Sequence, residues 1–319
     1  MSFSAEVKKE LAKNMSGARH CQIAELAAMI SMVADIQYKD NIPVRLKIAT
    51  ERSVIARNIS GLIRKLFHYL PEVSVRRTGS NSRLYRMMVT DAAMVQKMLD
   101  TLKLIGQDDI GMGVSEVSCQ DMKISGLITQ QDCCRRAFLK GAFMTSGSIS
   151  DPNKGYHLEI VCNNDIRALF IKKLIREFDI EGRIVRRKRY RVVYVKDGAM
   201  IVDMLNIMGA HISLMNMENV RILKDISNNI NRRVNCEAAN LNKTVSAAVK
   251  QIQDINYIIE TKGIKYLPEN LRSLAEVRLE AEDASLKELG EMMNPPLGKS
   301  GVNHRLRKIS EIADELRGL

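Results

Sequence analysis

The sequence predicts an α+β protein in which two similar α/β halves are followed by linker helices and an all-helical domain. Three observations support this fold class. A pattern of helices and strands occurs twice in the first two thirds of the chain, a long polar helical segment follows it, and three amphipathic helical segments close the chain. A chain of 319 residues can hold two or three domains. We expect boundaries at 1–212, 213–262 and 263–319.

The two halves, at about 20–106 and 133–209, are each predicted to contain a helix, a strand, a helix, two strands and a final helix. After its opening helix, the first copy reads "PVRLKIA", "ERSVIARNISGLIRKLFHYL", "EVSVRR", "RLYRMMV" and "DAAMVQKMLDTLKLI". In the second, the opening helix in "LKGAFMTSGSIS" is predicted to stop at Gly147 and to turn directly into a strand. The elements "HLEIVC", "NDIRALFIKKLIREF", "GRIVRRKRYRVVYV" and "DGAMIVDMLNIM" follow. Chance similarity of two amphipathic patterns is the alternative, and a match at successive hairpin positions speaks against it: Val75, Arg76 and Arg77 correspond to Val185, Arg186 and Arg187.

The lengths of the connecting segments differ between the two copies. The first hairpin contains the loop "TGSNS", for which the second copy has almost no counterpart. Residues 107–130 join the two copies.

The charge of the chain favours a polyanionic partner. The formal net charge is +12 and the pI is about 9.4, and binding of such a protein to phosphates releases counterions. A basic cytosolic protein without such a partner is the alternative, so the distribution of the charges must decide. The longest apolar run, "IAELAAMISMVA", is too short to span a bilayer and contains Glu25. We therefore expect a cytoplasmic, nucleoid-associated protein without a membrane partner.

The six cysteines form no C-x-x-C pair. This pattern favours reduced thiols over a disulfide framework or a zinc site. We expect neither a metal nor another cofactor.

The end of the chain is predicted to form three helices. The first is "PENLRSLAEVRLEAED"; Ser285 and Glu288 then form a capping box for the second, which ends near Asn294 before two prolines. The third helix, from about 301 to 316, has an apolar side made of Val302, Leu306, Ile309 and Ala313. Its opposite side and flanks present Lys299, Ser300, Asn303, His304, Arg305, Arg307 and Lys308.

This arrangement is typical of a helix-turn-helix domain that binds double-stranded DNA, with polar side chains for base edges and cations for phosphates. Asn303 suits adenine, and Arg305 or Arg307 suits guanine. We interpret His304 as a polar surface residue without a catalytic role.

Two further basic groups are candidates for DNA contact. The hairpin strands of both halves are rich in arginine, and two such ribbons can form a saddle along a duplex. An ordinary solvated hairpin face is the alternative. The predicted saddle residues are Arg76, Arg77, Arg83, Arg86, Arg186, Arg187, Lys188, Arg189 and Arg191.

The linker is predicted to consist of helices broken around Arg233–Glu237. Its basic residues Arg232, Arg233 and Lys243 could contact phosphates or lock the two domains together. A solvated linker helix is the alternative.

The opening helix of each half resembles the LAGLIDADG motif of homing endonucleases. Small residues at Ala27 and Ala28, and at Gly141 and Ala142, permit close packing of the two helices. The second copy matches the motif at Leu139, Gly141, Phe143, Gly147, Ser148 and Ile149, and the first more loosely at Leu26, Ala27, Ile30 and Ile36.

The catalytic acids of that family are replaced here. The resemblance implies that an acid before the last glycine of each motif holds a divalent metal, and these positions are Val33 and Ser146. Asp35 and Asp151 lie nearby but are displaced along the chain, and we interpret them as solvated loop acids. We therefore expect no catalytic residues, no metal and no enzymatic activity.

The combination resembles the WhiA family of bacterial regulators. The similarity covers essentially the whole chain and includes "MSFSAEVKKEL", "CCRRAFLKGAFMTSGSISDP", "NRRVNCEAANLNKT" and "NPPLGKSGVNHRLRKI". It implies a degenerate LAGLIDADG-like domain, a helix-turn-helix domain and a role in transcription regulation, sporulation, chromosome segregation or cell division.

Three alternatives stay open at this point. An architectural nucleoid protein would bind unrelated duplexes equally and with a steep salt dependence. An active metal-dependent homing endonuclease would nick DNA with Mg²⁺. Finally, the degenerate domain could bind RNA polymerase or another transcription regulator.

Overall fold

The computed structural model describes residues 2–78, 82–105, 114–119 and 121–318. The chain divides into two compact units, Met1–Lys224 and Asp225–Leu319. Most of the predicted loop "TGSNS", at 79–81, and residues 107–113 and 120 of the predicted joining segment lie outside the described residues.

The first half of the first unit is a five-stranded antiparallel sheet with helices against it. Helix α1 (Phe3–Lys13) precedes this half. Its sheet has the order β3-β4-β2-β1-β6. The elements are α2 (Arg19–Val33), β1 (Ala34–Lys39), β2 (Ile42–Thr50), α3 (Ser53–Phe67), β3 (Glu72–Thr78), β4 (Ser82–Val89), α4 (Ala92–Thr101) and β6 (Val114–Ser118).

The second half repeats this topology with shorter strands. Its sheet has the order β10-β11-β9-β8, which corresponds to β3-β4-β2-β1 of the first. A two-stranded ladder of β5 (Leu104–Ile105) and β7 (Lys123–Ile124) and the 3₁₀ turn Gly126–Thr129 lie between the halves in sequence. The elements are α5 (Asp132–Ser146), β8 (Gly147–Ile149), β9 (Leu158–Cys162), α6 (Asp165–Arg176), β10 (Arg183–Arg187), β11 (Tyr190–Val195) and α7 (Gly198–Met208).

The predicted repeat is confirmed. Within the described residues, the sheet of the first half contains two strands that we did not predict, β1 and β6, and the strand predicted directly after Gly147 is β8. Strands β1 and β8 follow α2 and α5 without a loop, because Ala34 and Gly147 both take extended backbone angles at the helix ends. A Cβ atom at Gly147 would lie 2.3 Å from the Phe143 ring. The hydrophobic run of the first copy, "AELAAMISMVADI", continues through the junction, and this continuity hid the change from helix to strand.

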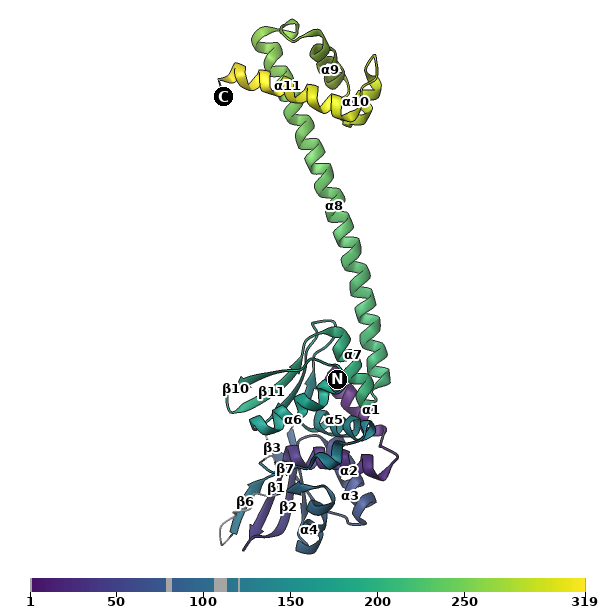
Figure 1. Ribbon diagram of the computed structural model, residues 1–319, viewed down its shortest axis with the longest axis vertical. Coiled ribbons are helices and arrows are strands. Elements are labelled where there is room, and N and C mark those ends of the chain that lie inside the picture. The colour runs from purple at the N-terminus through teal and green to yellow at the C-terminus, as the bar shows by residue number, and fades with distance from the viewer. Residues whose placement is uncertain (1, 79–81, 106–113, 120, 319) are drawn as a thin grey trace. The chain divides into compact units, whose positions relative to one another are not determined.

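The core of the first unit forms around α2 and α5. Figure 1 shows the strands of both halves reaching out on one side of these two helices. Where the helices pack together, a Cβ atom at Gly141 would lie 2.4 Å from the Glu25 carbonyl oxygen and 3.0 Å from Ala28 Cβ. Glycine is therefore required at this position for the close approach of the backbones.

A buried ion pair crosses the same contact. The ammonium of Lys140 lies 3.1 Å from Glu25 Oε1, and both side chains are almost fully buried. Ser16 Oγ donates a hydrogen bond to Glu25 Oε2 at 3.0 Å, and Lys140 also donates to the Asn14 carbonyl. This network joins the two halves, since Glu25 belongs to α2 and Lys140 to α5.

Helix α8 (His211–Lys262) is one uninterrupted helix, so the predicted break around Arg233–Glu237 is wrong. The segment contains no glycine or proline, and it lies between Gly209 and Gly263, which have positive φ angles of 84° and 79°. Inside the predicted break, Arg233 Nε and Glu237 Oε1 form an ion pair at 3.0 Å with the spacing that stabilises a helix. Asparagine weakens a helix only slightly, so the polar residues of this segment do not interrupt it.

The second unit has its own core of helices. Besides its part of α8 it contains η2 (Ile264–Tyr266), α9 (Glu269–Glu280), α10 (Leu286–Met292) and α11 (Lys299–Arg317). Ile255 and Ile258 of α8 are fully buried in this core. Arg317 also binds Asp254 at 2.7 Å. The end of α8 is therefore part of this folded unit.

Candidate nucleic-acid interface

The last helix, α11, separates its apolar and polar residues as the sequence predicts. Val302, Leu306, Ile309 and Ala313 are at most 2% exposed. Of the polar residues, Arg305 is half-buried, because its Nη1 donates to the Asn270 carbonyl of α9 at 3.1 Å. The others are exposed together along the N-terminal half of the helix: Lys299, Ser300, Asn303, His304, Arg307 and Lys308.

The turn between α10 and α11 fixes where this helix begins. The predicted capping box is confirmed: Ser285 Oγ accepts from Glu288 N, and Glu288 Oε2 accepts from Ser285 N at 2.7 Å. The hydrogen bond from the Ser285 backbone N–H lowers the pKa of Glu288, and a hydrogen bond from the Ser285 side chain adds to this effect. At the other end of α10, Leu297 N donates to the Gly290 carbonyl at 2.9 Å. A Cβ atom at Gly290 would lie 2.1 Å from the Leu297 carbonyl oxygen, a requirement that our sequence reasoning missed.

Helix α8 adds one of the predicted linker cations to this surface. A pocket of about 410 Å³ is lined by Lys243, Ala247 and Gln251 of α8 together with Lys287, Lys299 and Asn303. Arg278 also lines it, and burial lowers the pKa of its guanidinium, whose Nη1 donates to the Ala284 carbonyl at 2.5 Å. Three lysines thus lie around one concave surface at the start of α11.

Arg232 and Arg233, the other predicted linker residues, do not line this pocket. Both are exposed on α8. The guanidinium of Arg233 is engaged in the ion pair with Glu237.

The pairing of the strands divides the predicted saddle residues between two faces of each sheet. Residues that lie opposite each other on neighbouring strands point to the same face, and alternate residues point to opposite faces. Leu46 and Ile48 of β2 are buried in the core and pair with Val89 and Met87. We call the other side of each sheet, away from this core, the open face.

In the first half, Arg76 and Arg86 lie on the open face. Arg86 pairs with Ala49 and Arg76 with Leu84, whereas Arg77 and Arg83 pair with each other on the side of buried Met87. Arg45 and Lys47 also lie on the open face, and our sequence reasoning missed them. The alternation of "VRLKIA" with its buried Leu46 could have identified them.

In the second half, Arg187 lies on the open face with Tyr190, and Arg183 lies there opposite Tyr194. Arg186 and Arg191 pair with each other on the side of the buried Val193. Arg191 makes a two-bond ion pair with Asp165 at the start of α6, at 2.5 and 2.9 Å. This arginine therefore anchors the hairpin to α6.

The turn of this hairpin carries the remaining predicted saddle residues, Lys188 and Arg189. Both are exposed. The guanidinium of Arg189 lies 5.0 Å from the centre of the Tyr190 ring. The turn thus presents a cation held against an aromatic side chain.

The open face of the second half also contains a carboxylate. Glu159 lies 3.2 Å from Arg187 and 3.1 Å from His157. Burial acts to raise the pKa of Glu159, but the hydrogen bonds from His157, Arg187 and Ser148 outweigh it and hold the pKa below its usual value. Glu159 therefore balances part of the charge of Arg187, whereas Lys188 and Arg189 at the turn are exposed.

Val33 and Ser146 stand at the C-terminal ends of α2 and α5, where the resemblance places metal-binding acids. Ser146 Oγ donates to the Ala142 carbonyl of its own helix at 3.1 Å. Asp151 is held by Asn153, whose backbone and side-chain N–H groups donate to Oδ1 at 2.9 and 3.0 Å and lower its pKa. Burial raises the pKa of Asp35, which lies on β1 beside Lys47. The two acids are not placed at equivalent positions of the repeat.

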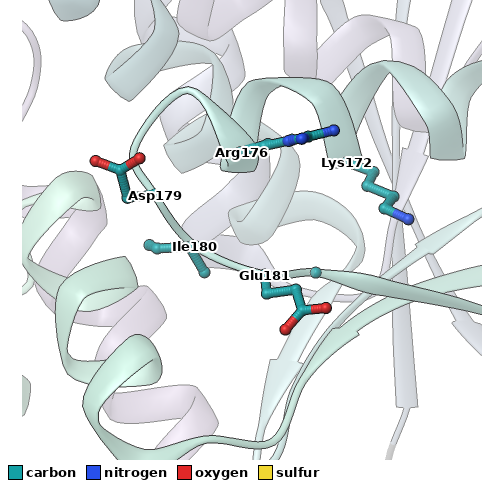
Figure 2. A pocket seen from close by; sticks show the side chains of 6 residues that line it. Lys172, Arg176, Asp179, Ile180 and Glu181 are labelled. Carbon is teal, nitrogen blue, oxygen red and sulfur yellow. The ribbon is translucent and has the colours of Figure 1, made fainter.

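A pocket of about 500 Å³ lies at the end of α6, before β10. Figure 2 shows the carboxylates of Asp179 and Glu181 on either side of Ile180, pointing away from each other. Arg176 and Lys172 line the same pocket. The two acids therefore do not form a carboxylate pair of the kind that glycoside hydrolases use.

Among the described residues, no helix is long and apolar enough to cross a membrane.

Family models for three WhiA domains match the chain. They are the WhiA N-terminal LAGLIDADG-like domain over residues 19–105, the WhiA LAGLIDADG-like domain over 135–227 and the WhiA C-terminal HTH domain over 230–313.

Full-length relatives show the same similarity. A probable cell division protein WhiA of Lachnoclostridium phytofermentans is 47% identical over 319 residues, covering 99% of this chain and 100% of the relative. One of Alkaliphilus oremlandii is 48% identical over 327 residues, covering 99% of this chain and 98% of the relative. Among solved structures, full-length DUF199/WhiA from Thermatoga maritima matches 99% of both chains with a TM-score of 0.57 and 24% identity. The predicted fold class is confirmed.

Proposed function

This chain belongs to the WhiA family, and from that premise we propose that it is a non-catalytic protein that binds double-stranded DNA sequence-specifically. Its cellular role is transcription regulation in cell division, chromosome segregation and sporulation, at the nucleoid in the cytoplasm. Support for the link to division comes from the relatives, which are named probable cell division proteins.

The exposed face of α11 is the observation that carries this proposal. Its polar residues lie on one side, while the opposite apolar side fixes the helix to α9 and α10. A rigid helix with amide and guanidinium groups at its N-terminal half can enter the major groove and read base edges. Asn303 and Arg307 are our candidates for this readout, and Lys299, Lys308 and Lys243 for phosphates.

The open face of the repeat domain supplies further affinity for the DNA backbone. Arg76, Arg86, Arg183 and Arg187 are exposed there. These cations add a salt-dependent contribution that does not depend on sequence. The replacement of both motif acids supports the absence of cleavage, and a nicking assay with supercoiled DNA and Mg²⁺ tests it: nicking above background would contradict a non-catalytic role.

Binding of the full-length chain to a genome-enriched duplex and to a shuffled duplex tests the role of α11. We expect Asn303→Ala and Arg307→Ala each to cost about 1–3 kcal/mol on the enriched duplex, with little change on the shuffled one. Glu311→Ala, an exposed change on the same helix, is the matched control and should retain the preference. Equal losses on both duplexes would favour the architectural alternative.

The open face is tested by a second pair of variants across a salt series. Arg86→Ala and Arg187→Ala should weaken binding to both duplexes and reduce the salt slope by about one per phosphate contact. Arg83→Ala and Arg186→Ala remove arginines from the other side of the same strands and should leave the slope unchanged. If the open-face variants keep full DNA affinity but lose regulation, this face binds RNA polymerase or another transcription regulator instead.

A further inference from the structure

The N-terminal ends of α2 and α5 bring together four potential metal ligands. His20 and Cys21 lie in the first turn of α2, and Cys133 and Cys134 lie in the first turn of α5. His20 and Cys133 are 113 residues apart, the same separation as between the motif positions Leu26 and Leu139. The four residues are therefore two copies of the same pair of helix positions, and the internal symmetry places them side by side.

The geometry of the cluster fits a tetrahedral ion. The imidazole Nδ1 of His20 lies 3.1 Å from Cys134 Sγ, 3.4 Å from Cys21 Sγ and 3.9 Å from Cys133 Sγ. All four ligand atoms lie within 4.8 Å of one another. In a tetrahedral zinc site with bonds of about 2.0–2.3 Å, ligand atoms lie roughly 3.5–3.8 Å apart. Small rotations of the side chains would bring the four atoms to such a site.

The surroundings favour a negatively charged complex over a bare cation. A zinc ion with three thiolates and a neutral imidazole carries a net negative charge. The N-terminal ends of two helices stabilise such a charge through their dipoles. The guanidinium of Arg136 adds a positive charge, since Arg136 lines an adjoining pocket of about 520 Å³ together with Cys21 and Cys133. This pocket also gives an ion a path from solvent to the sulfur atoms.

We propose that His20, Cys21, Cys133 and Cys134 bind one zinc ion that joins the two halves of the repeat domain. Three sulfur ligands and one nitrogen ligand are typical of a closed, structural zinc site. Cys21 and Cys134 supply the buried side of the site, and His20 and Cys133 its exposed side. Sequence reasoning excluded zinc because it looked for a C-x-x-C pair, whereas the fold joins two ligand pairs that are far apart along the chain.

The metal content of the purified full-length chain tests this proposal. The chain is produced with added zinc, without a histidine tag, and dialysed before elemental analysis. A second sample is stripped with a chelator under reducing conditions and titrated with Co²⁺, whose absorption spectrum reports tetrahedral thiolate ligands. The variants are His20→Asn and Cys133→Ser, which change exposed ligands, and Cys236→Ser, which changes an exposed cysteine of α8 as the matched control.

We expect about one zinc per chain in the unchanged protein and in Cys236→Ser, with loss of zinc and of the cobalt spectrum in the two ligand variants. Circular dichroism establishes that the variants are folded. Zinc at background level in the unchanged protein, together with no thiolate bands from cobalt, would overturn the proposal whatever the variants do. A disulfide between the two cysteine-bearing helices in freshly purified, metal-free protein would likewise overturn it and would indicate a redox site.

Discussion

The two ends of the α2–α5 helix pair have opposite chemical character. The C-terminal ends carry Val33 and Ser146, and α1 packs beside them with the ammonium of Lys8 over the Phe143 ring at 5.6 Å. The N-terminal ends carry one imidazole and three thiols within a few ångströms of one another. Val33 and Ser146 occupy equivalent positions of the two copies, as His20 and Cys133 do, but only the N-terminal ends carry side chains that can bind an ion.

The largest expected effect concerns the ion pair that crosses this helix contact. Glu25→Ala leaves the buried ammonium of Lys140 without its carboxylate and should reduce the free energy of unfolding by about 3–5 kcal/mol. Urea denaturation of the full-length protein measures this change. Glu6→Ala, at an exposed position of α1, is the control.

The double variant Glu25→Leu/Lys140→Met removes both charges and should recover most of the lost stability, because it leaves no unpaired buried ion. If the double variant is as unstable as Glu25→Ala, packing and not charge dominates this contact.

The second effect concerns Lys8 at the C-terminal ends. Burial, with a smaller contribution from Arg52, lowers the pKa of Lys8 to about 7. In the unfolded chain lysine has its usual pKa of about 10.4, so between these values the unfolded state binds more protons. The cost of burying Lys8 should therefore fall as the pH rises. Its effect is that the free energy of unfolding increases between about pH 7 and pH 10 and does not depend on pH below 7.

Lys8→Met should remove this rise and stabilise the protein at neutral pH by an amount on the order of 2–3 kcal/mol. Urea midpoints across the pH range measure the difference from the unchanged protein, so that other titrating groups cancel. Exposed Lys9→Met is the control. A parallel pH dependence in Lys8→Met and the unchanged protein would show that Lys8 keeps its ordinary affinity for protons.

The smallest effect would come from restoring acids at the former metal positions. Val33→Asp/Ser146→Asp places two carboxylates at helix C-termini, where the dipoles oppose them, and should cost about 1–2 kcal/mol. Millimolar Ca²⁺ should raise the melting temperature of this double variant and so restore part of its stability, because carboxylates are preferred ligands of Ca²⁺. The unchanged protein should show no such shift. A double variant that does not respond to Ca²⁺ would show that the helix ends no longer have the geometry of a metal site.

The sequence predicted most of the features that depend on local patterns. The capping box at Ser285, the buried side of α11 and the repeated order of elements follow from spacings of a few residues, and the structure has all three. Strand β1 escaped prediction because α2 passes into it within one hydrophobic run, whereas the strand predicted directly after Gly147 is present as β8. The break predicted around Arg233–Glu237 was wrong, because a polar stretch without glycine or proline does not by itself end a helix.

The candidate site was less predictable because it depends on which residues the fold brings together. The sequence does not show that Arg86 and Arg187 lie on the open face while Arg83 and Arg186 lie behind it, because this depends on strand register. The approach of His20 to Cys134 depends on the packing of two helices from different halves. Both kinds of information are properties of tertiary structure, whereas the arginine content itself was visible from the start.

The pairing of Glu25 with Lys140 also makes the two halves depend on each other. The position in α5 equivalent to Glu25 is Phe138, and the position in α2 equivalent to Lys140 is Ala27. Two copies of the first half, assembled as a symmetric dimer, would bury two carboxylates without an ammonium, and two copies of the second half would bury two ammonium groups without a carboxylate. Neither half can therefore form this contact with a copy of itself and keep its buried charge paired, so each half needs the other as its partner.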